Sequence, residues 1–154
     1  MDKNIISLEY KEFLEQLKEL VSTSRYQAAR SVNKELIILY HYIGSEILKR
    51  QQQHGWGAKV IDKLSRDLRS AFPEMKGFST RNLKYMRQFA EEYPDSAFVQ
   101  EVLAQLTWYH NITLLDKLTD KEIRFFYVKH SITYGWSRNI MIMCRSQDLI
   151  LQTP

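Results

Sequence analysis

The chain has 154 residues, of which 44% are hydrophobic and 26% charged, and its formal net charge is +4. This length suits one domain, or one domain with an extended helical arm, without a stabilising metal or disulfide. Cys144 is the only cysteine, which excludes an internal disulfide and favours a reducing compartment. No apolar run reaches the roughly 18 residues of a membrane span, and residues 1–4 do not lead into a signal-peptide core. We therefore expect a cytoplasmic protein without membrane contact.

The first third of the chain carries two helical patterns. Glycine and proline are scarce, with 5 and 3 copies, so helix is favoured over strand throughout and an all-α fold is predicted. Apolar residues recur at helical spacing over residues 6–21 and again from about Arg25 to Gln53. The polar segment Ser22-Thr23-Ser24 is either a break or a polar turn between them. Residues 1–54 are predicted to form a long helical arm, as one helix or a helix pair.

The remaining helices are predicted from their start and stop signals. Trp56, Phe78 and Trp136 each precede a small residue and a new helical pattern, which is typical of a hydrophobic staple around an N-cap. Pro73 and Pro94 end two of these helices. Helix starts are predicted near Ala58, Thr80, His110, Asp120 and Arg138, with Ser79, Ser137 and Thr119 as caps, and residues 95–105 carry a weaker helical pattern. Residues 55–143 thus form a predicted helix-turn-helix-like domain, and residues 144–154 a tail.

The helices predicted over 58–71 and 80–93 contain the candidate functional face. A short turn with Pro73 and Gly77 joins them, as in a helix-turn-helix. On the second helix, the inner face is predicted to carry Leu83, Met86, Ala90 and Tyr93. The opposite face is predicted to carry Arg81, Lys84, Tyr85 and Gln88. These outer side chains include donors for phosphates and base edges, and one aromatic ring that can stack.

Charge supports the same region. Residues 59–87 contain eight basic and three acidic side chains, an excess of +5, which leaves about −1 for the rest of the chain. We therefore predict nucleic-acid binding through Thr80, Arg81, Lys84, Tyr85 and Gln88, while Lys59, Lys63, Arg66 and Lys76 contact phosphates. The alternative for the same residues is an ordinary solvated helix face.

No catalytic, metal or cofactor site is predicted. The four histidines are scattered, and none has a second ligand at metal-binding spacing. His110 is predicted to be a hydrogen-bonded packing residue, and Cys144 to belong to the core or the tail. Glu74 and Lys76 match the Glu-x-Lys of nuclease sites, but they lie in a predicted turn rather than on a strand. A hydrolase using His110 is the most remote alternative.

A longer string of short motifs carries a family resemblance. In order, these are Ala29-Arg30, Val32 to Ile37, Leu39-Tyr40, Ile43-Gly44, Gln51-Gln52, Gly55-Trp56-Gly57, Leu64 to Leu68, Phe72-Pro73, Gly77-Phe78-Ser79, Arg81-Asn82-Leu83, Met86-Arg87, Trp108, His110-Asn111, Arg124, Tyr127 and Gly135 to Arg138. Their order and spacing resemble the N-terminal domain of the YhcG-like family, whose second domain is assigned to the PD-(D/E)xK nucleases. The resemblance implies a helical DNA-binding and assembly region that works with a nuclease domain or subunit.

The sequence also departs from that family. The family usually has a tryptophan near His41 or Tyr42 and a Pro-Trp pair where Thr107-Trp108 stands, and the resemblance ends after Met141. No nuclease domain follows, so we expect no nuclease activity from this chain. The alternative function is a protein-interaction or homo-oligomerisation module built on the helix from Arg25 to Gln53.

Overall fold

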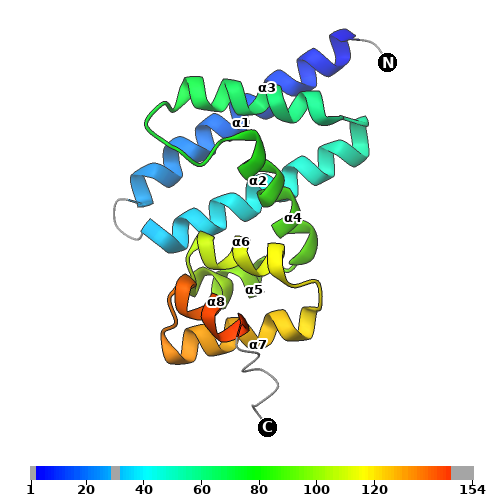
Figure 1. The fold of residues 1–154 in the computed structure, drawn as a ribbon. Helices are drawn as coiled ribbons and strands as arrows, with labels where there is room; N and C mark the ends of the chain where they lie inside the picture. The colour runs from blue at the N-terminus through cyan, green and yellow to red at the C-terminus, as the bar shows by residue number, and fades with distance from the viewer. Residues whose placement is uncertain (1–2, 29–31, 147–154) are drawn as a thin grey trace.

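The computed structural model describes residues 3–28 and 32–146, and every regular element within those ranges is helical (Figure 1). The elements are α1 (Lys3–Ala28), α2 (Val32–His54), α3 (Ala58–Ala71), α4 (Thr80–Glu92), α5 (Ser96–Glu101), the 3-10 helix η1 (Leu103–Gln105), α6 (Trp108–Lys117), α7 (Lys121–Tyr134) and α8 (Arg138–Ser146). The predicted all-α fold is confirmed. Of the predicted tail, residues 144–146 end α8, and the rest lies outside the described residues.

The boundary between the first two helices differs from the prediction. The polar segment 22–24 neither breaks nor turns the chain, and α1 continues through it to Ala28. One reason is visible at Thr23, whose Oγ1 donates a hydrogen bond to the backbone oxygen of Glu19, so that the hydroxyl is satisfied inside the helix. The start predicted near Arg25 for the second helix was therefore wrong, and α2 begins at Val32.

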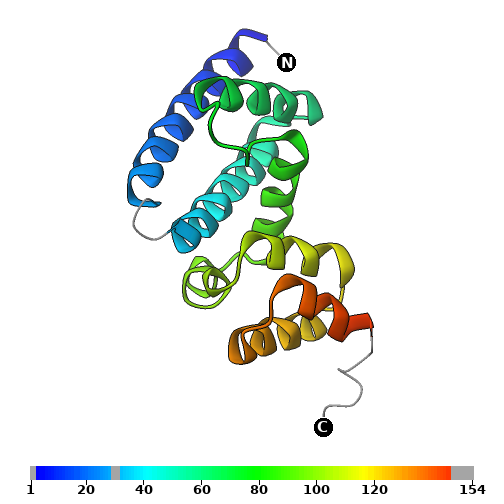
Figure 2. The ribbon, with the colours of Figure 1, turned by 60° about the vertical axis from the view of Figure 1, so that its left-hand side comes forward.

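The first three helices lie at one end of the molecule and the last helices at the other. In Figure 1, α1, α2 and α3 lie together, and α5 to α8 form the opposite end. Figure 2 shows α4 running between the two groups. The most extensive helix contact is between α2 and α4, where Gly44 faces the backbone of Met86. A Cβ atom at Gly44 would overlap the Met86 carbonyl, so glycine permits this close crossing.

The core is continuous through these helices. Leu39, Ile43 and Ile47 of α2 are buried in the same cluster as Leu83 and Met86 of α4. Side chains before and after residue 54 therefore belong to one hydrophobic core. The alternative function predicted from the sequence, a homo-oligomerisation module, was placed on the second helix. Because Leu39, Ile43 and Ile47 are buried within one chain, they do not supply a surface for a second copy.

Two predicted helix starts are confirmed by their side-chain caps, and the predicted start of α3 at Ala58 is confirmed without one. Ser79 Oγ accepts a hydrogen bond from the backbone N–H of Asn82 at 3.1 Å, and Ser137 Oγ accepts one from Ile140 at 3.2 Å. The Thr119 cap was wrong. The carboxylate of Asp120, one residue later, accepts from the backbone N–H groups of Glu122 and Ile123 instead.

The start of α6 also lies earlier than predicted. Thr107 caps the helix, and its hydroxyl and the His110 side chain form a reciprocal capping box. His110 is buried, and its Nε2 atom lies 2.8 Å from the backbone oxygen of Trp136. The predicted packing role of His110 is confirmed.

Among the helices described here, none is long and apolar enough to cross a membrane.

Candidate nucleic-acid interface

The beginning of α4 is held by three hydrogen bonds, one buried and two partly buried. Ser65 Oγ of α3 donates to the backbone oxygen of Phe78 at 2.6 Å. The Asn82 amide donates to the Gly77 oxygen at 2.7 Å and accepts from Trp108 Nε1 of α6 at 2.8 Å. These bonds fix the first turn of α4 against α3 and α6. The connection from α3 to α4 covers residues 72–79, which is longer than the ~3–4-residue turn of a helix-turn-helix.

The two faces of α4 separate as predicted. Leu83, Met86 and Ala90 are buried, together with Phe89. On the other side, Arg81, Lys84 and Gln88 are exposed, whereas Thr80 and Tyr85 are half-buried. The outer face of α4 therefore presents two cations and one amide to solvent.

Tyr85 is less free than the sequence indicates. Its hydroxyl donates to the Asp116 carboxylate of α6, with oxygen distances of 2.9 and 2.8 Å. The Arg81 guanidinium donates to the same hydroxyl at 3.3 Å and lies 5.5 Å from the ring centre. The hydrogen bond to Tyr85, with a smaller contribution from Asp116, raises the pKa of Arg81. Tyr85 thus links α4 to α6, and Asp116 is a partner that sequence reasoning missed.

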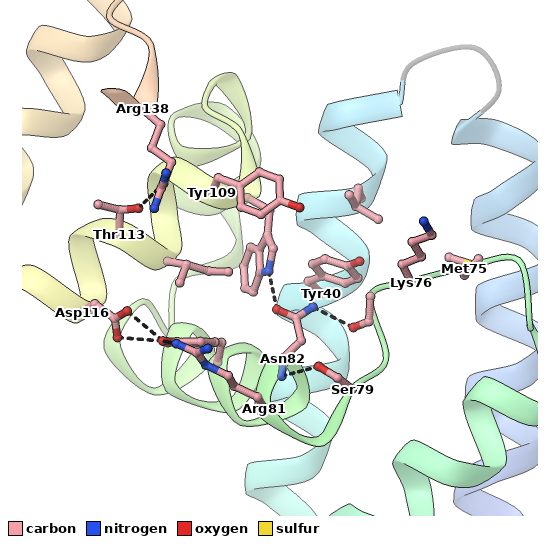
Figure 3. Close-up of a pocket in the computed structure, with 15 residues that line it drawn as sticks. Tyr40, Met75, Lys76, Ser79, Arg81, Asn82, Tyr109, Thr113, Asp116 and Arg138 are labelled. Atoms are coloured by element: carbon pink, nitrogen blue, oxygen red, sulfur yellow. Dashed lines mark hydrogen bonds between the residues drawn. The ribbon is translucent and has the colours of Figure 1, made fainter. Parts of the chain in front are cut away.

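A groove opens beside this contact. It lies between α4, α6 and the connection before α4, and its volume is about 650 Å³ (Figure 3). Tyr40 and Trp108 form buried parts of its lining, while the Tyr109 side chain is 69% exposed. The charged lining residues are Lys76, Arg81 and Arg138, with Asp116 as the acidic one. The groove therefore combines aromatic rings with an excess of positive charge.

The predicted site residues fall into separate groups. Lys76, Arg81 and Tyr85 line the groove, and Arg81, Lys84, Tyr85 and Gln88 line the adjoining outer surface of α4. Lys63 lies elsewhere, in a hollow between α1 and α3 that also contains Lys11 and Lys18. Its ammonium is 3.3 Å from Asp67 and 5.0 Å from the Tyr10 ring centre. Lys59 and Arg66 are exposed on α3 and line neither α4 surface.

Several groove residues were missed by sequence reasoning. Arg138 begins α8, and its Nε atom donates to Thr113 Oγ1 of α6 at 3.0 Å, which directs its side chain toward the groove. Tyr40 comes from α2 and Tyr109 from α6. These residues share no local sequence pattern that indicates a groove. The only usable sequence feature was the adjacent aromatic pair, in which Tyr109 is exposed and Trp108 is buried.

Within residues 3–28 and 32–146, no group of three or more histidine, cysteine, aspartate and glutamate side chains could hold a metal ion. Glu74, the acid of the weak Glu-x-Lys match, lies in a turn after α3 and not on a strand.

The chain thus folds as an all-helical domain whose groove is lined by aromatic and positively charged side chains. The chain belongs to the family described as the DUF1016 N-terminal domain, which matches residues 16–149. It is also similar to the Escherichia coli (strain K12) protein named "Putative nuclease YhcG", with 26% identity over 160 residues, 83% of this chain and 42% of that protein. The chain thus spans less than half the length of this curated relative. No solved structure matches it significantly. The family resemblance identified from the sequence motifs is confirmed. Its expected end after Met141 was wrong, because the family match continues to residue 149.

Proposed function

We propose that this domain binds nucleic acid, DNA before RNA, and is not itself catalytic. The observation that carries the proposal is the outer face of α4, where the cations Arg81 and Lys84 lie beside Gln88 on an exposed surface. Guanidinium and ammonium groups neutralise phosphates, and a glutamine amide can read a base edge. Thr80 and the free N–H groups of the first turn of α4 add donors for a phosphate.

The relative adds a functional context. A protein named as a nuclease acts on nucleic acid, and this chain is similar to part of it. In this proposal, the present domain binds the nucleic acid, and a separate nuclease domain or subunit cleaves it. Lys76 extends the basic surface along the groove, and Lys59 and Arg66 supply further phosphate contacts from α3. Lys63 contributes less, since Asp67 already pairs with it.

The test is a binding titration with single- and double-stranded DNA and RNA at two salt concentrations. We expect measurable affinity that falls as salt rises, because bound phosphates release counterions. Lys84→Ala should weaken binding, whereas Lys121→Ala, which removes an exposed lysine from α7, should not. The proposal fails if no probe binds at low salt, or if both lysine variants bind like the wild type.

Self-association is the second candidate, as a homo-oligomerisation module. Leu39, Ile43 and Ile47 of α2 are buried. The exposed apolar side chains that favour self-association include Ile140 and Met143 of α8, which are 42% and 52% exposed. Sedimentation of the wild type and of the double variant Ile140→Glu with Met143→Glu would test self-association separately from nucleic-acid binding. A wild-type monomer at high concentration would exclude self-association and leave nucleic-acid binding untouched.

A further inference from the structure

Tyr40 brings a polar group to the wall of the groove. The residue is only 4% exposed, and it lines the groove together with Trp108 and Tyr109. Its ring packs edge-on against Trp108, with ring centres 4.9 Å apart. The Tyr40 hydroxyl lies beside Gly77, which also lines the groove, and there it can donate a hydrogen bond to a ligand.

The surroundings of Tyr40 keep its hydroxyl available as a donor. Burial, with a smaller effect of the nearby Tyr109, raises the pKa of Tyr40 to about 12, so the phenol stays protonated at neutral pH. Gly77 lies beside the hydroxyl, and a Cβ atom at that position would overlap it. The glycine therefore leaves room for the hydroxyl at the groove wall.

The groove has the size and the lining for one nucleotide. Its volume of about 650 Å³ falls within the range of small-molecule pockets, roughly 300–1,000 Å³. Figure 3 shows Tyr40, Tyr109, Lys76 and Arg81 around the same hollow. The exposed ring of Tyr109 offers a stacking surface, and Lys76, Arg81 and Arg138 offer charge for phosphates.

We propose that the groove takes one unstacked nucleotide of a single-stranded nucleic acid. Its base lies on the Tyr109 ring and accepts a hydrogen bond from the Tyr40 hydroxyl, while Arg81 and Arg138 hold the flanking phosphates. This inference rests on the proposed function and names the class of nucleic acid. A base inside a duplex is stacked on its neighbours and must be flipped out to enter a pocket, whereas a single strand offers its bases freely.

The experiment compares two fluorescent probes by anisotropy, an oligothymidylate of about 20 nucleotides and the corresponding duplex with oligodeoxyadenylate. We expect the wild type to bind the single strand about tenfold more tightly than the duplex. Tyr109→Ala should weaken single-strand binding by about tenfold, in line with the loss of one base–aromatic stack. The control is Tyr134→Ala, which removes a tyrosine of similar exposure, 65%, outside the groove.

Tyr40→Phe tests the hydroxyl separately. It should weaken single-strand binding by about two- to tenfold, the effect of one hydrogen bond, without lowering the midpoint of urea unfolding. A merely structural role would reverse this pattern, with a lower unfolding midpoint and unchanged single-strand affinity. That result would overturn the assignment of the hydroxyl to a ligand.

A further variant separates this inference from the proposed function. Lys84→Ala with Gln88→Ala changes the outer face of α4 and leaves the groove lining intact. If this variant weakens binding of both probes while Tyr109→Ala changes neither, the groove proposal is wrong and the α4 proposal stands. A wild type that prefers the duplex would likewise overturn the groove proposal. If neither probe binds the wild type at low salt, both proposals fail.

Discussion

Gly44→Ala tests the helix crossing that positions the candidate interface. The new Cβ atom would overlap the backbone carbonyl of Met86 in α4, which cannot move aside as a side chain could. Overpacking of this kind costs typically ~1–3 kcal/mol, and a backbone obstacle places the cost near the upper end. Alanine recovers about 1 kcal/mol through its higher helix propensity. The free energy of unfolding should therefore fall by about 2 kcal/mol.

Urea unfolding followed by circular dichroism measures this change. With a slope of about 2 kcal/mol per molar urea, the midpoint should fall by about 1 M at an unchanged slope. Gly57→Ala is the matched control, because a Cβ atom there meets nothing within 4 Å and the backbone φ is −98°. Its cost should stay below about 1 kcal/mol, from the weaker helix cap. A Gly44→Ala protein as stable as the wild type would show that α2 and α4 do not cross this closely.

Three further predictions concern stability and activity. The Asp67 pKa is raised by burial but lowered more strongly by hydrogen bonds from Tyr10 and Lys63. Asp67→Asn should therefore lower stability at neutral pH, and its difference from the wild type should shrink as the pH falls below 3.8. A difference that stays constant from pH 7 to pH 2 would contradict this. Arg124→Ala should destabilise by about 2–4 kcal/mol, since the buried guanidinium binds Glu92 and the backbone oxygens of Leu118 and Thr119. The exposed Arg81→Ala, its control, should cost under about 0.5 kcal/mol in chemical unfolding. Finally, the chain should show no magnesium-stimulated cleavage of DNA, and cleavage that survives repurification but disappears in Glu74→Ala would refute this.

Local chemistry explains why parts of the fold could be predicted. The caps at Ser79 and Ser137 depend on residues within three positions, and the two faces of α4 follow from helical spacing alone. The same reasoning placed the cap of α7 at Thr119, because two adjacent residues can both cap a helix. Asp120 does so in the structure, since its carboxylate accepts from two N–H groups.

The groove could not be predicted in this way. Tyr85 meets Asp116 across 31 positions of the chain, and Trp108 meets Asn82 across 26. Such contacts depend on how the helices pack, which spacing within one helix does not reveal. The same limit applies to α2. Its apolar series was correctly identified, but the helices that cover Ile43 and Ile47 become evident only in three dimensions.

The central claim is that the outer face of α4 binds nucleic-acid phosphates. The most direct measurement is the salt dependence of duplex DNA affinity for the wild type and for Arg81→Ala with Lys84→Ala. Each lost phosphate contact should reduce the slope of log K against log salt by about 0.9, so the double variant should lose about 1.8 units. Lys121→Ala with Lys129→Ala removes the same charge from α7 and should keep the wild-type slope. An α4 double variant with unchanged affinity and slope, or an α7 control that loses as much, would contradict the claim.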